Sequence, residues 1–481
     1  MAVYNETNLQ NLSEDAFLRI DVDYINIKKE FTQNKVFNKF KEFMTFLETG
    51  KSITKADYAE GESEYAHVVV RNIKNGEYFE ENMVYLNDEK GEELEEYRLN
   101  KGDIVIAISS NVGASFYYAG ESELNLTLSH YLTRCRVNKN YIDPRFFVYY
   151  LNSGLIKKYF RAVETGKTQK NLSKYYIKNL PILFNPDISV QKEIMNQIIP
   201  IENEIKELKI LLKDPLEAIN TVFAREFNYD PELWKKFGKG MTVLTQKCES
   251  VGLKTFNLDF INLENSNILR FSTRYHNEYA GQLLELLKSI GSIPVKEIIT
   301  KPIKRGRQPV NSPDGEICVI KTGQLKNKCV DLSGCTMVTE EFYEGSERAR
   351  VFSGDVLIAS TGKGSLGKVD IVESDEKLVV DGHISILSID NTKYNPLFFI
   401  FYMRSILGGF QFERDYTGAT NQIELYANEI HEFLVPNIEI EKQCRIVNEI
   451  KQKLNENKLI EKHIEEKCAK IEEIIKNVIL N

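Results

Sequence analysis

The segment Gly362–Gly367 of this 481-residue chain contains glycines spaced as in loops that bind a dinucleotide or S-adenosylmethionine. Such a loop needs a helix directly after it, because the ligand is held by the amide groups and dipole of the helix N-terminus. The following residues, 368–372, instead alternate apolar and polar side chains, as a strand does. The pattern therefore predicts a strand–turn–strand and no cofactor loop.

Two further stretches resemble catalytic signatures. Asn395-Pro396-Leu397-Phe398 is similar to the Asn-Pro-Pro-aromatic motif of adenine methyltransferases, but the second proline is missing. A polar N-cap followed by proline at the first helical position explains this segment equally well, so we expect a helix start there. Pro186-Asp187 followed by Glu204 and Lys206 has nuclease-like spacing. Glu204 and Lys206 flank an apolar helix seam, however, where charged side chains face water.

The remaining reactive residue types are dispersed along the chain. The six histidines lie apart, and His130 and His383, at matching places in two similar segments, suggest a core hydrogen bond rather than catalysis. Seven cysteines include no CxxC pair, and the closest group, Cys318, Cys329 and Cys335, has no paired histidines. We therefore expect buried thiols in a reducing compartment, a cytoplasmic protein, no structural metal and no enzymatic activity in this chain.

Charge is distributed unevenly along the chain. The formal net charge is −8 and residues 57–96 are strongly acidic, which argues against a uniformly basic nucleic-acid binder. Residues 157–178 and 296–307 are basic runs, either solvated surface or nucleic-acid contacts. Apolar runs of membrane-spanning length are absent, and the polar, acidic beginning of the sequence does not resemble a secretory signal, so we expect no membrane association.

The elements that would position functional residues occur twice. Gly102–Ala107 recurs as Gly354–Ala359, Asp143-Pro144 as Asn395-Pro396, the glycine loop at 166 as that at 418, and Gln191 as Gln443. The constant offset identifies residues 17–230 and 268–481 as two copies of one unit. In each copy the sequence pattern predicts short strands, a capped helix, a polar glycine loop and a long helix, in this order. This order indicates an α+β globule followed by a helical arm.

Both arms carry apolar residues at alternating spacings of three and four. Such a stripe packs against a partner helix, and the simplest partner of each arm is the other, in an antiparallel pair. A seam of about 20 residues would span roughly 30 Å, near one turn of B-DNA. The alternative is that each helix packs on its own globule. The predicted pairing residues are Ile194, Ile198, Ile201, Ile205, Leu208, Leu212, Ile450, Ile464, Ile471 and Ile475.

The ordered set of motifs, occurring twice, resembles the specificity (S) subunits of Type I restriction–modification systems. It comprises the Gly-Asp-apolar strands, the Val112-Gly113 and Leu366-Gly367 turns, the Gly-x-Thr-Gln-like loops and the proline-to-glutamine stretches that lead into the arms. The resemblance implies two target-recognition domains, at 1–185 and 268–437. It also implies helical spacer arms at 186–230 and 438–481, paired as an antiparallel coiled coil, and a connector at 231–267 lies outside it.

The resemblance further implies a non-catalytic DNA-recognition subunit that reads a bipartite, asymmetric double-stranded target. Its partners would be two adenine-N6 methyltransferase subunits and restriction/translocase subunits, which would hold S-adenosylmethionine, ATP and Mg. Alternatives are a subunit of a methyltransferase-only or other phage-defence system, or a regulatory decoy that binds no DNA.

Sequence readers need donor-rich side chains on loops that reach base edges. For the first copy the predicted DNA-binding residues are Lys51, Ser52, Thr54, Lys55, Arg71, Asn72, Lys167, Thr168, Gln169 and Lys170. For the second they are Lys301, Lys304, Arg305, Arg307, Gln308, Lys321, Thr322, Gln324, Thr420, Asn421 and Gln422. Each could instead belong to a solvated loop.

Overall fold

A computed structural model of the chain describes residues 22–32, 36, 38–61, 63–74, 76–166, 169–230, 275–276, 278–327, 329–419 and 422–480. The predicted connector at 231–267 lies outside these residues. The chain divides into two compact units, one of residues 1–211 with 460–481 and one of residues 212–459.

The first unit is built on a four-stranded antiparallel sheet. Its strand order is β2 (Met44–Thr49), β10 (Leu132–Val137), β7 (Ile104–Ala107) and β8 (Ser115–Tyr117). A three-stranded sheet of β6 (Val84–Tyr85), β3 (Tyr65–Val68) and β9 (Asn125–Leu128) accompanies it, with β3 and β9 parallel. Its shorter elements are α2 (Val22–Thr32), β1 (Asn38–Lys39), β4 (Ile73–Lys74), β5 (Glu77–Tyr78), α3 (Asp88–Glu93), α6 (Lys174–Lys178) and β11 (Pro181–Ile182).

The second unit repeats this framework. Its first sheet has the order β13 (Lys304–Arg305), β20 (Ile384–Leu387), β17 (Val356–Ala359) and β18 (Val369–Ile371). Its second sheet has the order β15 (Thr336–Val338), β14 (Ile317–Ile320), β19 (Leu378–Val380) and β16 (Arg350–Val351), again with one parallel pair. The shorter elements are α11 (Glu278–Ser289), β12 (Ser292–Pro294), α12 (Glu340–Glu344), β21 (Thr417–Ala419), β22 (Gln422–Glu424), α15 (Ala427–His431) and β23 (Leu434–Pro436).

A capped helix follows the sheets in each unit, as the sequence predicts. Asp143 and Asn395 each accept two backbone N–H groups at the starts of α4 (Pro144–Asn152) and α13 (Pro396–Arg404). The next helices are α5 (Gly154–Val163) and α14 (Ile406–Asp415). The phenylalanines on α4 and α13 are buried in the cores of their units, so these helices cover the sheets.

One buried glutamine in each unit fixes the start of the long helix. The Gln191 side chain accepts a hydrogen bond from the Asp143 N–H at 2.8 Å and donates to the Tyr141 carbonyl at 2.7 Å. The Gln443 side chain accepts from the Asn395 N–H at 2.8 Å and donates to the Ile438 carbonyl at 2.8 Å. The repeated pair thus ties each long helix to the cap of the helix before it.

Replacing Gln443 with leucine should lower the melting temperature of the chain. The Asn395 N–H and the Ile438 carbonyl would lose their partner, at a cost of roughly 1–3 kcal/mol for each buried group left unpaired. Replacing Gln452 with leucine is the matched control, because that amide is exposed and donates to Glu456 on the same helix. Differential scanning calorimetry of both variants checks the prediction, and equal melting of the two would contradict it.

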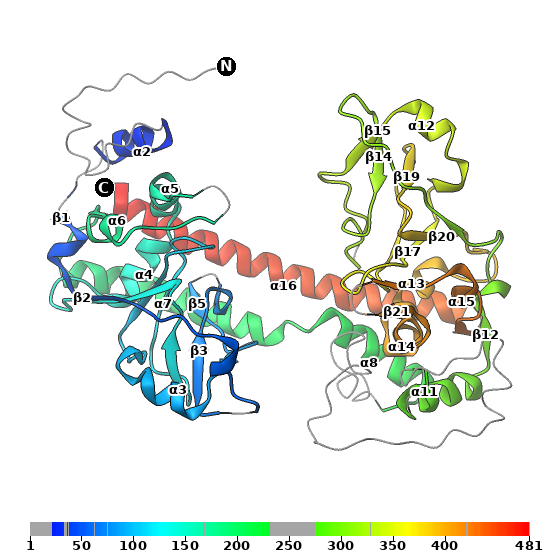
Figure 1. Cartoon of the computed structure of the whole chain (residues 1–481), viewed down its shortest axis with the longest axis horizontal. Helices are drawn as coiled ribbons and strands as arrows, with labels where there is room; N and C mark the ends of the chain where they lie inside the picture. Colours follow the sequence, from blue (N-terminus) through cyan, green and yellow to red (C-terminus); the bar gives the residue numbers. More distant parts are fainter. Residues whose placement is uncertain are drawn as a thin grey trace. The chain divides into compact units, whose positions relative to one another are not determined.

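The long C-terminal helix α16 (Ile440–Leu480) contributes to both units and appears as one continuous red helix in Figure 1. In the first unit its residues Ile471, Ile475 and Ile479 share a buried cluster with α7 (Ile188–Leu211). The α7 residues in that cluster include Ile194, Ile198, Ile201 and Ile205, and Ile464 packs against it half-buried. Glu204 forms an ion pair with Lys467 beside this seam.

In the second unit α16 packs against α8 (Pro215–Phe227). Arg225 bonds Glu449, Arg445 bonds Glu226 at 2.8 Å, and Asn457 bonds the Lys213 carbonyl at 2.6 Å. Residue numbers rise on one helix as they fall on the other, so the pair is antiparallel.

The structure alters two of the predicted arm boundaries. The expected arm at 186–230 is two helices, because the helix ends at Leu211 and α8 begins at Pro215 behind an Asp214 N-cap. The expected arm at 438–481 is divided between the units at residue 459. Ile450 accordingly lies in the core of the second unit, while Leu208 and Leu212 are only half-buried.

Candidate nucleic-acid interface

A polar glycine turn projects beside the main sheet of each unit. In the first unit Thr165 and Asn171 pair across the turn, and the Leu172 N–H donates to the Ile108 carbonyl at 2.8 Å. In the second unit β21 and β22 form the corresponding hairpin, and the Leu425 N–H donates to the Ser360 carbonyl at 2.9 Å. The glycines at the two turns have φ of 100° and 93°, a region that side chains disfavour. The same anchor therefore presents two different side-chain sets.

The predicted tips of both turns lie partly outside the described residues. Lys167 and Thr168 in the first unit, and Thr420 and Asn421 in the second, fall outside the described ranges. Gln169 and Gln422 are described and exposed. The Gln169 amide donates to the Ser109 hydroxyl at 3.1 Å, and Lys170 forms an ion pair with Glu164 at 3.2 Å.

Several predicted residues of the second unit line one concave surface, which encloses a volume of about 630 Å³. Arg305, Gln308 and Gln422, three of the residues predicted to bind DNA, line it. The sequence search did not single out Arg348, Thr361 or Glu424, which also line it. Arg348 stands among glutamates in the sequence, so a search for basic runs passes over it.

Two of the predicted arginines use their donors within the protein. The Arg305 guanidinium bonds the Gly382 carbonyl at 2.7 Å, the Thr361 hydroxyl at 2.5 Å and the Glu424 carboxylate. Arg307 donates to the Gly345 carbonyl at 2.9 Å. These bonds fix the walls of the concave surface and leave fewer N–H groups for a ligand.

The other predicted residues of the second unit are spread over separate segments. Lys301 and Lys304 are exposed, on either side of the buried Ile303. Lys321 and Thr322 are half-buried after β14. The Gln324 side-chain oxygen accepts the Lys321 N–H at 3.1 Å, so this amide closes the turn that presents them.

The predicted residues of the first unit divide into exposed and structural groups. Lys51, Ser52 and Lys55 are exposed, and the Lys51 ammonium lies 4.6 Å from the Tyr97 ring centroid. A hydrogen bond to Tyr97 raises the pKa of Lys51, which keeps it cationic. The Asp57 carboxylate accepts from the exposed Thr54 hydroxyl at 2.9 Å and from the Thr54 backbone N–H at 2.6 Å, at the start of a short 3₁₀ turn at Lys55–Asp57.

Arg71 and Asn72 differ in what they offer to a ligand. Arg71 is exposed, although one of its N–H groups donates to the Asn82 carbonyl at 2.9 Å. Asn72 corrects a prediction, because it is only 1% exposed and its amide bonds the Val69 N–H and the carbonyls of Phe79 and Glu81. Its side chain organises a turn and cannot reach a base.

The glycine segment and the histidines that were considered for catalysis have structural explanations. The Gly362–Gly367 segment connects the antiparallel strands β17 and β18, as predicted. His67 is buried against Thr127 at 2.8 Å, and burial lowers its pKa to about 4, so it is neutral near pH 7. The predicted core hydrogen bond is wrong for His383, which is exposed and lines the concave surface.

The structure corrects the expectation of buried free thiols. Cys318 on β14 and Cys335, just before β15, form a disulfide, because the antiparallel pairing of these strands brings their Cα atoms to 5.8 Å. Cys135 is buried as expected, whereas Cys329 and Cys468 are exposed. Across the described ranges, no cluster of three or more His, Cys, Asp or Glu residues could hold a metal ion.

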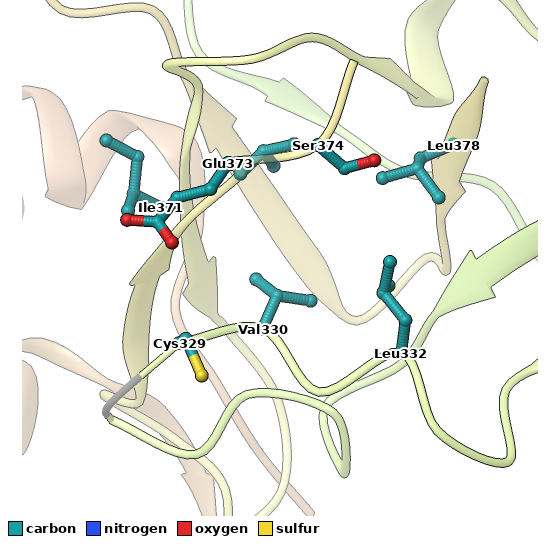
Figure 2. Close-up of a pocket in the computed structure, with 8 residues that line it drawn as sticks. Cys329, Val330, Leu332, Ile371, Glu373, Ser374 and Leu378 are labelled. Atoms are coloured by element: carbon teal, nitrogen blue, oxygen red, sulfur yellow. The ribbon is translucent and has the colours of Figure 1, made fainter. Parts of the chain in front are cut away.

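A smaller hollow of about 270 Å³ lies in the second unit. Figure 2 shows Val330 and Leu332 extending from one segment toward the residues opposite, which include Ile371 and Leu378. Its lining is mainly aliphatic, with Glu373 and Ser374 at one side. It lacks the converging cationic and amide donors that nucleic-acid recognition requires.

Comparison with known proteins finds a family model that matches part of the chain. Residues 29–213 match the model of the Type I restriction modification DNA specificity domain. Over this segment, which is less than half of the chain, the protein is similar to that family. None of the described helices is long and apolar enough to cross a lipid bilayer.

A curated relative is "Putative type I restriction enzyme MjaX specificity subunit" of Methanocaldococcus jannaschii, 28% identical over 149 residues. The match covers 29% of this chain and 35% of that relative, about a third of its length. A solved S subunit from M. genitalium is 14% identical, with 92% of this chain and 95% of that chain covered and a TM-score of 0.41. A chain from a structural study of type I restriction–modification assembly is 12% identical, with 92% and 96% covered and a TM-score of 0.44.

Proposed function

We propose that the chain is the DNA-specificity subunit of a Type I restriction–modification complex and reads a bipartite, asymmetric target in double-stranded DNA. The repeated framework supports the proposal most directly. Both units have the same main-sheet order and anchor a glycine turn by equivalent backbone hydrogen bonds, but the side chains on the turns differ. Two similar scaffolds with different exposed donors suit two different half-sites.

The two readers gain affinity from being joined in one chain. Once one unit is bound, binding of the other becomes intramolecular, which raises its effective concentration. The helices α7, α8 and α16 are the proposed spacer that fixes the gap between half-sites, in an antiparallel coiled-coil arrangement. Their exposed faces are the proposed docking surface for two adenine-N6 methyltransferase subunits and for restriction/translocase subunits.

The proposed role assigns the chemistry to the partners. S-adenosylmethionine would be bound by the methyltransferase subunits, and ATP and Mg by the partner subunits of the assembly. The residues of this chain would select the target and orient the partners over it. The resemblance of Asn395-Pro396 to a methyltransferase motif gives no support for activity, because that asparagine caps α13.

The purified chain should neither methylate nor cleave DNA, and adding the cognate methyltransferase subunits should produce methylation at one bipartite motif. The measurement is transfer of labelled methyl groups to plasmid DNA, followed by long-read sequencing to locate modified adenines. Methyl transfer by the chain alone would contradict the non-catalytic assignment. A chain that assembles with methyltransferase but leaves the motif unchanged would contradict DNA recognition and favour the regulatory decoy.

A further inference from the structure

Three arginines lie around the concave surfaces of the second unit, and they differ in how their donors are used. Arg305 bonds a carbonyl, a hydroxyl and a carboxylate of the same unit. Arg307 donates to the Gly345 carbonyl and the Ser346 hydroxyl, and its guanidinium lies 5.3 Å from the Phe342 ring centroid. Both therefore hold protein segments together, which makes them positioning residues.

Arg348 differs from Arg305 and Arg307 in that its guanidinium does not connect protein segments. It is exposed on the 3₁₀ turn Glu347–Ala349, which is anchored by the buried Ala349. Within the described part of the chain, no hydrogen bond or ion pair joins its guanidinium to another residue. Arg348 lines the concave surface with Arg305 and also the adjoining one of about 510 Å³ with Arg307. Its planar set of N–H donors is therefore available to a ligand.

The groups around Arg348 distinguish between the parts of DNA that it could contact. Gln308 and Gln422, which line the same surface, are exposed amides that can both donate and accept hydrogen bonds. The Glu424 carboxylate, which pairs with Arg305, is part of the same lining, and it can accept from the amino group of a base but not from a phosphate, which has no donor. Amides, a carboxylate and a free guanidinium together match base edges better than the sugar–phosphate backbone.

We propose that Arg348 is the guanine-reading residue of the second unit, donating to the O6 and N7 atoms of one guanine in the major groove. This inference rests on the proposed function and assigns one residue of its recognition surface. Arg305 shapes the surface through Gly382, Thr361 and Glu424. Gln308 and Gln422 are the neighbours placed to contact adjacent base pairs.

The experiment compares Arg348→Ala, Arg348→Lys and the control Lys288→Ala, each assembled with the cognate methyltransferase. Lys288 is an exposed cation of the same unit on α11 and forms an ion pair with Glu285. Long-read methylome sequencing reads the modified motif of each variant. Binding titrations on oligonucleotides with single base changes, at several salt concentrations, measure discrimination and salt dependence.

Both Arg348 variants should relax one G·C position in one half-site and leave the other half-site unchanged. Discrimination at that position should fall roughly 5- to 150-fold, because lysine cannot reproduce the two parallel bonds of the guanidinium. Lys288→Ala should keep the native motif. Melting curves establish that the Arg348 variants are folded, and lysine at the exposed position keeps the charge.

Three results would overturn the assignment. An unchanged motif in both variants would show that Arg348 does not read a base. Uniform weakening on all sequences, restored by lysine and with a shallower salt dependence in the alanine variant, would identify a phosphate contact. Relaxation in both half-sites would place the effect outside the second unit alone. Failure of the wild-type assembly to bind any specific motif would instead remove the proposed function itself.

Discussion

Replacing Ile198 with aspartate should destabilise the first unit by on the order of 5 kcal/mol, comparable to the total stability of many domains. Ile198 is completely buried on α7, in a cluster that contains Ile471, Ile475 and Ile479 of α16. A carboxylate there would lose its hydration without gaining a partner. Thermal melting, with limited proteolysis to identify the unfolded segment, measures the effect.

The same helix supplies a matched control for that substitution. Ile210 also lies on α7 but is 82% exposed, so Ile210→Asp should leave the melting temperature almost unchanged. Ile475→Asp, on the opposite side of the seam and 2% exposed, should reproduce the loss seen with Ile198→Asp. Comparable melting of Ile198→Asp and Ile210→Asp would show that the seam does not support the fold of the first unit.

Exchanging residues 17–180 for the matching segment of another family member should change one half of the methylated motif completely and preserve the other half. Each unit has its own buried clusters, sheets and anchored turn, so recognition should transfer with the unit. The retained α7 and α16 helices keep the proposed spacer, so the gap should also persist. Methylome sequencing of cells carrying the hybrid chain with its methyltransferase gives the result.

The reciprocal hybrid, exchanging residues 268–437, is the control and should change only the other half. A hybrid that altered both halves together would contradict independent readers. A native motif that proved continuous and palindromic would contradict the bipartite model directly.

Local sequence signals predicted the framework well where one residue determines the local geometry. Asp143 and Asn395 cap their helices because a short acceptor followed by proline suits only a helix start. The strand–turn–strand at 356–371 followed from alternating side chains after the glycines. On α7, Ile194, Ile198, Ile201 and Ile205 share a buried cluster with α16, whereas Leu208 and Leu212, which continue the same spacing, do not belong to it.

Residue type alone could not predict which polar side chains remain available to a ligand. Asn72 looked like a base reader, but its amide is buried in a turn. Arg305 and Arg348 have identical chemistry, and only the tertiary structure shows that the first is bonded and the second exposed. The helix break before Pro215 was obscured by the apolar spacing, which continues to Leu212.

The sharing of α16 between the units has a consequence for synthesis on the ribosome. The core of the first unit includes Ile471, Ile475 and Ile479, which are translated only after the whole second unit has been made. Until then the side of α7 that packs against α16 is uncovered and accessible to chaperones, proteases or other nascent chains. Loss of the last helical turns through a premature stop codon should therefore damage the unit encoded first, while the second retains its own section of the helix.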